Sequence, residues 1–74
     1  MVSVKVVRTS TGKAVEGIRV GIGFEGLFRG MAKDQYTNSD GEAHFDNDPG
    51  DGDVYVDGMS KFKGRIQGKV VVYI

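Results

Sequence analysis

Apolar residues in this chain recur at every second position, and this period is the feature that most constrains the fold. In the clearest stretch, glycines and one arginine alternate with Ile18, Val20, Ile22 and Phe24. A two-residue period places alternate side chains on opposite faces of a strand, whereas a helix requires a period near 3.6. No window of the sequence shows an apolar helical stripe. The chain is therefore expected to be all-β.

Turn-forming clusters divide the chain into about seven short strands. The 12 glycines are spread along the sequence, and Gly, Asn, Asp or Ser residues gather at 10–13, 38–41, 47–52 and 57–58. Short strands separated by frequent turns are typical of an antiparallel sandwich or barrel. We therefore predict a small Greek-key β-sandwich of about seven antiparallel strands, formed by residues 1–74 as one domain.

The last two strand patterns predict a hairpin with a bulged turn. A three-residue connection at 67–69 places Ile66 opposite Val70, so that apolar residues share a face, whereas a two-residue turn would mix cations with apolar residues. In this hairpin, Gly68 or Lys69 lies in or beside the left-handed position.

The composition excludes several functions. A chain of 74 residues buries only about 60% of its unfolded surface, and the absence of cysteine excludes disulfides and cysteine metal sites. Ten basic residues balance ten acidic ones, which gives no reason to expect a nucleic-acid partner or an anionic membrane. The first residues lack a signal-peptide pattern, and no apolar run is long enough to span a membrane, so a cytoplasmic protein is expected.

Two segments resemble the carboxypeptidase regulatory-like domains of the transthyretin-like, or prealbumin-like, superfamily. Residues 11–20 (TGKAVEGIRV) resemble the second-strand signature of these domains, although Ala14 stands where the family often has Pro. Residues 36–45 (YTNSDGEAHF) resemble their Thr-x-x-x-Gly-x-apolar-x-Phe hairpin. The resemblance implies an immunoglobulin-like sandwich of prealbumin-like topology, and it implies nothing about function.

No catalytic arrangement is visible in the sequence. The 5-hydroxyisourate hydrolases of the same superfamily use several histidines, an arginine and a C-terminal Tyr-Arg-Gly-Ser, whereas this chain has only His44 and ends Val-Val-Tyr-Ile. His44 has no second metal-binding partner and no nucleophile beside it, so an ordinary outward position on a strand is expected. We expect no catalytic residue, no cofactor, no metal and no enzymatic activity.

Three other motifs have simpler structural explanations. Residues 21–26 match G-x-G-x-x-G, but no helix pattern follows to receive a pyrophosphate. The acidic turn at 46–53 leaves a weak calcium site open, although its residues are ordinary turn formers. Lys61, Lys63 and Arg65 could bind phosphates, but like charges on a solvent-exposed face also protect a sheet edge. We therefore expect no nucleic-acid partner.

Two groups of residues are candidates for protein contacts. The segment 26–31 places large apolar side chains and an arginine in an apparent connection, where they either form an interface or cap the sandwich. In the last strand, alternate residues suffice to cover the core, which leaves a second apolar face that a single-layer sheet must have covered. The candidate partner-binding residues are Leu27, Phe28, Arg29, Met31, Val71 and Tyr73.

These observations predict a non-enzymatic protein-interaction or structural module that forms a homo-oligomer. The alternative is a small-ligand or carbohydrate-binding module, which would need a concave pocket with Tyr36 or Tyr55 as an aromatic platform. Gly17, Gly21 and Gly23 leave one strand face nearly bare, which permits either strong twist or the close approach of a partner.

Overall fold

The computed structural model describes residues 1–26 and 30–74, and among them it contains strands and no helix. This confirms the all-β prediction. The strands are β1 (Val2–Arg8), β2 (Lys13–Ala14), β3 (Arg19–Phe24), β4 (Gly30–Met31), β5 (Gln35–Tyr36), β6 (Glu42–Phe45), β7 (Gly50–Val56), β8 (Met59–Ile66) and β9 (Gly68–Tyr73).

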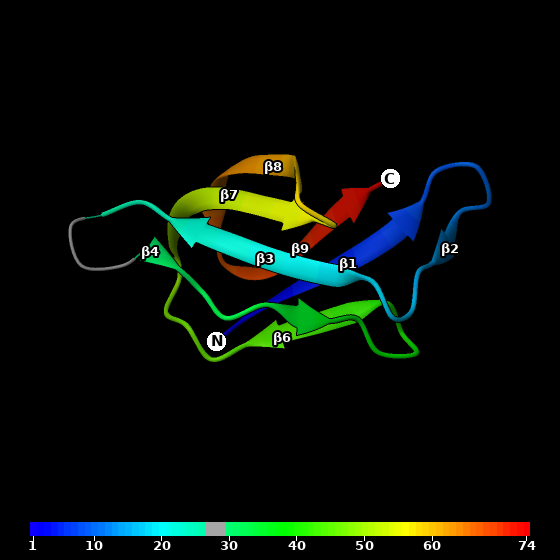
Figure 1. Cartoon of the computed structure of the whole chain (residues 1–74), viewed down its shortest axis with the longest axis horizontal. Helices are drawn as coiled ribbons and strands as arrows, with labels where there is room; N and C mark the ends of the chain where they lie inside the picture. Colours follow the sequence, from blue (N-terminus) through cyan, green and yellow to red (C-terminus); the bar gives the residue numbers. More distant parts are fainter. Residues whose placement is uncertain (27–29) are drawn as a thin grey trace.

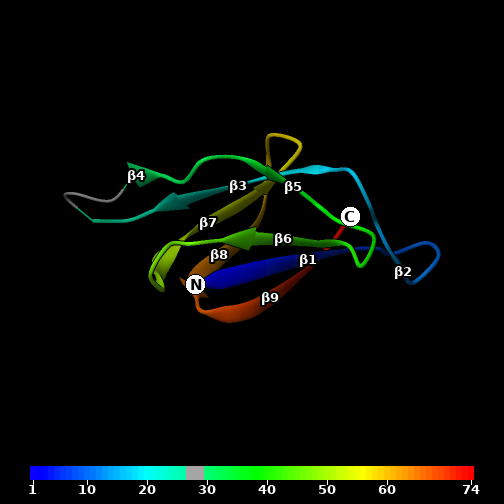
Figure 2. The ribbon, with the colours of Figure 1, turned by 90° about the horizontal axis from the view of Figure 1, so that it is seen from below.

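The strands form two sheets that lie one over the other (Figures 1 and 2). In the first sheet, called sheet A, β1 is central: β9 pairs along one of its edges, and β6 and β2 pair along the other. In the second, sheet B, the order is β8–β7–β3, and β5 and β4 share the remaining edge of β3. This two-layer arrangement is compatible with a β-sandwich.

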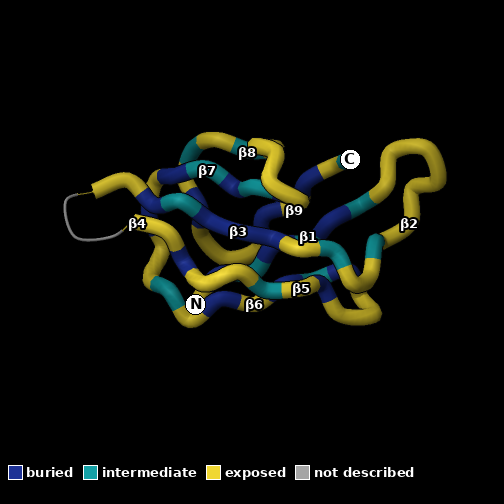
Figure 3. Tube along the Cα trace, viewed as in Figure 1, coloured by how far each residue is buried: buried dark blue, intermediate teal, exposed yellow. Residues whose placement is uncertain are grey.

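The core lies between the two sheets, because the long strands turn one set of alternate residues inward (Figure 3). On β3, Val20, Ile22 and Phe24 are buried as predicted, and Ile18 packs against the core just before the strand. The remaining buried apolar residues are Val2, Val4, Val6, Ala32, Ala43, Phe45, Val54, Val56, Ile66, Val70 and Val72. Each fully buried Val or Ile contributes about 1.5–3 kcal/mol to folding, so this small cluster supplies most of the stability.

The position of β9 differs from the prediction. It leaves β8 and pairs with β1 in parallel, from Val2 beside Gly68 to Val7 beside Tyr73. The predicted β8–β9 hairpin is therefore wrong, and so is the expectation that all strands run antiparallel. Gly68 has the predicted positive φ, 59°, but there the chain crosses from sheet B to sheet A.

Two predicted turns are confirmed. Asp57 and Gly58 have φ values of 51° and 84°, and this two-residue turn with two positive angles joins β7 to β8 as a tight hairpin. In the connection from β5 to β6, the Asn38 side-chain oxygen accepts hydrogen bonds from the amides of Asp40 (2.9 Å) and Glu42 (3.1 Å). Gly41 in this turn has φ 75°, a conformation that favours glycine.

Thr37 ties the start of this connection to the chain before β3. Its side chain is buried, its hydroxyl donates to the carbonyl of Val15 at 2.6 Å, and the hydroxyl oxygen accepts from the amide of Ile18 at 3.0 Å. Main-chain hydrogen bonds join Thr37 to Gly17 and Ile18 as well. Thr37 therefore satisfies polar groups of a non-strand segment that runs beside the core.

Candidate functional site

The structure separates the candidate contact residues onto two surfaces. Val71 and Tyr73 lie on the outer face of sheet A, whereas Met31 lies on the outer side of sheet B, beside Gly23. The other three candidates, Leu27, Phe28 and Arg29, lie outside the described residues. Among the described candidates, Met31 is therefore not brought together with Val71 and Tyr73.

The first surface is an apolar area at one end of the outer face of sheet A. One row across the strands consists of Ala14 of β2, Val7 of β1 and Tyr73 of β9, which lie directly side by side. Val71 lies in the next row on the same face. Tyr73 is 61% exposed and Val71 is 42% exposed, while Val70 and Val72, which alternate with them, point into the core. We call these four outer residues the β9 patch. The prediction that β9 is apolar on both faces is confirmed.

The other end of the same face is polar. Glu42 forms an ion pair with Lys69, with Nζ and Oε2 2.8 Å apart, and lies 3.6 Å from the His44 ring. The hydrogen bond from Lys69 holds the pKa of the Glu42 carboxyl below its usual range. His44 shares a hydrogen bond of 2.8 Å with Ser3 and points outward, as predicted. These groups pair with one another, so the β9 patch is bounded on one side by satisfied polar residues.

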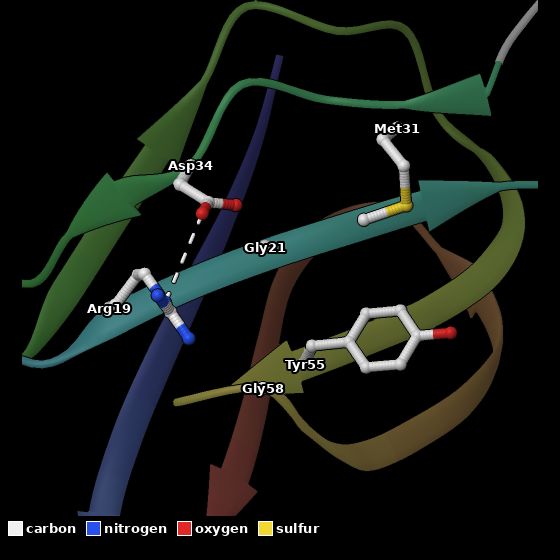
Figure 4. A pocket seen from close by; sticks show the side chains of 6 residues that line it. All are labelled: Arg19, Gly21, Met31, Asp34, Tyr55 and Gly58. Carbon is white, nitrogen blue, oxygen red and sulfur yellow. Dashed lines mark ion pairs between the residues drawn. The ribbon is translucent and has the colours of Figure 1, made fainter.

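The second surface is a hollow of about 300 Å³ on the outer face of sheet B (Figure 4). Its floor is β3, where Gly21 carries no side chain, and Figure 4 shows Met31 and Tyr55 on either side of this strand. Arg19 and Asp34 stand at the other end, with Nε and Oδ2 3.9 Å apart. The bare strand face noted in the sequence thus becomes the base of a concavity.

More carboxylates than cations lie around the hollow. Arg19 lies within 4.0 Å of Asp57 as well as near Asp34, so one cation stands between two acids. The Tyr55 hydroxyl donates to Asp53 Oδ2 at 3.2 Å, and this hydrogen bond raises the pKa of the Tyr55 phenol. The other oxygen of Asp53, Oδ1, is buried and has no hydrogen-bond partner among the described residues.

Three residues that line the hollow stand out in the sequence, but each for a different reason: Gly21 for a bare strand face, Met31 as a contact residue and Tyr55 as a possible aromatic platform. The sequence does not indicate that they form one site, and it does not point to Asp34 or Arg19. Tyr36, the other predicted aromatic platform, is exposed on β5 and does not line the hollow.

The remaining motifs keep their structural explanations. Gly21 and Gly23 of the G-x-G-x-x-G match lie within β3, and Lys61, Lys63 and Arg65 are exposed along β8. In the part of the chain that the structure describes, no group of three or more His, Cys, Asp or Glu side chains is placed to hold a metal ion. Residues 1–26 and 30–74 contain no helix with the length and apolar character needed to cross a membrane.

Comparison with known protein families, with curated proteins and with solved structures found no match for this chain.

Proposed function

We propose that this chain is a non-catalytic protein-interaction module that self-associates through Val71 and Tyr73 of β9. The observation that carries the proposal is the β9 patch, where Tyr73, Val7 and Ala14 stand in one row beside Val71. Aromatic and aliphatic side chains in one contiguous area are typical of the centre of an interface. A domain of 74 residues also has little apolar surface to leave unused, because its core is small.

The sandwich itself is proposed to be a prealbumin-like Greek key of the carboxypeptidase regulatory-like kind. The hairpin residues that carry the resemblance support this: Thr37 is buried and hydrogen-bonded, Gly41 has positive φ, and Phe45 points into the core. Leu27, Phe28, Arg29 and Met31 remain a predicted second contact for a protein partner.

Self-association is tested by light scattering over a concentration series. The native chain is expected to form a dimer or a larger species, and Tyr73→Lys is expected to raise its dissociation constant at least about tenfold, which corresponds to about 1.4 kcal/mol. The reason is that an ammonium group would lose its hydration in the interface without gaining a partner.

Met59→Lys is the matched control for Tyr73→Lys. Met59 on β8 is 63% exposed, close to the 61% of Tyr73, but it lies on sheet B and away from the β9 patch. This variant should associate like the native chain. Equal weakening by both substitutions would mean that net charge, and not the β9 patch, governs association. A native chain that remains monomeric at high concentration would contradict the proposal.

The hollow on sheet B favours a second candidate function, the binding of a small polar ligand such as a sugar. Tyr55 and Met31 offer apolar surface on either side of β3, whose outer face is bare at Gly21, and the Arg19–Asp34 pair offers a hydrogen-bond donor and an acceptor at one end. An apolar platform beside a few polar groups is the usual composition of a small-ligand site.

Ligand binding is tested by titrating the chain with N-acetylglucosamine, methyl β-glucoside and cellobiose. A binding sugar should shift the amide resonances of Gly21 and Gly23 in a saturable way, and Tyr55→Ala should weaken binding at least about tenfold through loss of its contact surface. Tyr36→Ala is the control, because Tyr36 is exposed and lies outside the hollow. If none of the three sugars shifts these resonances, the sugar-binding candidate is wrong.

A further inference from the structure

The outer edge of β9 has main-chain groups that point away from the rest of sheet A. The residue after β9, Ile74, directs both of its main-chain groups toward the chain of β1: its amide donates to Val7 at 2.9 Å, and its carbonyl accepts from Thr9 at 2.8 Å. Main-chain groups alternate sides along a strand, so Val70 and Val72 also face β1. The amides and carbonyls of the odd-numbered residues, Lys69 to Tyr73, therefore face the outer edge.

This edge has no other strand beside it in residues 1–26 and 30–74, where β9 pairs with β1 alone. It also lacks the structural features that normally prevent two sheet edges from pairing. β8, the edge strand of sheet B, carries Lys61, Lys63 and Arg65 and has an irregularity in its pairing with β7. On β9 the single cation, Lys69, is held by Glu42, and the strand contains no proline. β9 is therefore the less protected of these two edges.

The strand is self-complementary in an antiparallel arrangement centred on Val71. In that register Val71 lies opposite the second copy's Val71, and Lys69 lies opposite the second copy's Tyr73. All of these residues direct their amides and carbonyls to the outer edge, so each facing pair exchanges two main-chain hydrogen bonds. On the outer face, the alkyl stem of Lys69 lies against the Tyr73 ring of the second copy. On the core side, Val70 faces Val72.

We infer that two copies of this chain join edge to edge through β9, antiparallel and centred on Val71, so that sheet A continues from one copy into the other. This inference rests on the proposed self-association and specifies its geometry. Edge-to-edge pairing satisfies the outward main-chain groups, packs Val71 against the Val71 of the second copy and places Tyr73 against the Lys69 of the second copy. Packing of two β9 patches face to face would leave those main-chain groups unpaired.

The absence of cysteine makes single-cysteine variants direct reporters of this geometry. In the proposed register, the Cα atoms of a Val71→Cys pair lie about 5.5 Å apart, inside the range of about 4.4–6.8 Å that a disulfide needs. The control is Lys5→Cys, since Lys5 is beside Val71 in sheet A and on the same face. Two such residues would lie three strand spacings apart, about 14 Å, which is too far to be joined.

Under mild oxidation, Val71→Cys is expected to form a disulfide-linked dimer at least about ten times faster than Lys5→Cys, after correction for their rates in denaturant. A mixture of Lys69→Cys and Tyr73→Cys chains tests the register independently. It should yield mainly the mixed dimer, because the two positions face each other. Circular dichroism establishes that each variant retains the native strand content.

The outcomes separate the geometry from the self-association itself. Rapid linkage of Val71→Cys together with the mixed dimer supports edge pairing. Association in light scattering with linkage through Lys5→Cys in place of Val71→Cys overturns edge pairing and leaves self-association intact. A strict monomer overturns both. Mixed chains that form only the two symmetric dimers overturn the register centred on Val71.

Discussion

Replacing Gly52 with alanine is expected to lower the free energy of unfolding by about 3 kcal/mol or more, the upper end of the cost of overpacking a well-packed site. A Cβ atom at Gly52 would clash with the carbonyl oxygen of Gly23 and lie 3.0 Å from the Cα of Phe24. Both atoms belong to the main chain of β3, which pairs with β7 at this point. The clash can be relieved only by moving the strands apart. The total free energy of unfolding of a chain of this size is about 4–11 kcal/mol, so the variant would lose a large share of its stability.

The measurement is urea unfolding followed by circular dichroism, with Gly21→Ala as the matched control. Gly21 lies on β3, the strand that Gly52 of β7 would clash with. An added Cβ at Gly21 would meet only the Asp34 carboxylate, at 2.7 Å, and this half-exposed side chain can move aside. Gly21→Ala should therefore cost much less than Gly52→Ala. Equal effects of the two substitutions would show that the main chains of β3 and β7 do not approach each other this closely at Gly52.

The second large effect is expected from Thr37→Val, which keeps the shape of the side chain and removes its hydroxyl. The substitution leaves the amide of Ile18 and the carbonyl of Val15 without their partner. An unsatisfied polar group costs about 1–3 kcal/mol when it is fully buried. These two hydrogen bonds are partly buried, so losing both should lower the free energy of unfolding by about 2–3 kcal/mol. The midpoint of urea unfolding should fall accordingly, with an unchanged slope.

Thr37→Ser provides the control for this prediction. Serine retains the hydroxyl and loses only the methyl group, so it should cost about 1 kcal/mol, near the value for one buried methyl. A valine variant as stable as the serine variant would mean that the hydroxyl does not hold the segment between Val15 and Ile18. The same comparison tests the structural role of the threonine in the proposed family hairpin.

The sequence was sufficient to predict the features that depend on local chemistry. The alternation around Ile22 identified β3 and its buried face, because the two-residue period is a property of the strand itself. The turns at Gly41 and at Asp57–Gly58 followed from residues that tolerate positive φ. The two apolar faces of β9 were visible for the same reason, since each face is a set of alternate residues.

The partner of β9 could not be predicted in this way. The hydrophobic pattern indicates which apolar residues share a face, and it predicts Ile66 beside Val70 in one sheet. In the structure both residues point into the core, but from opposite sheets. Burial is satisfied equally by the two arrangements, so the hydrophobic pattern cannot distinguish them. The choice depends on where the chain bends at Gly68, which is a property of the tertiary structure.

The hollow could be predicted only in part for a related reason. The bare glycine face of β3 was evident, but the residues around it come from separate elements. Met31 belongs to β4, Asp34 precedes β5, and Tyr55 lies on β7. These residues meet because β3 has neighbours on both of its edges, and no local pattern records which strands those neighbours are.

The parallel pairing of β1 with β9 also has a consequence for how the chain folds during synthesis. Val2 and Gly68 pair although 66 positions separate them. At about 5–20 residues per second, roughly 3–13 s pass between the synthesis of these two partners. During that interval β1 is the centre of an incomplete sheet, with one edge open to other nascent chains. Folding through such distant contacts is slow, so this edge stays exposed to aggregation until β9 is made.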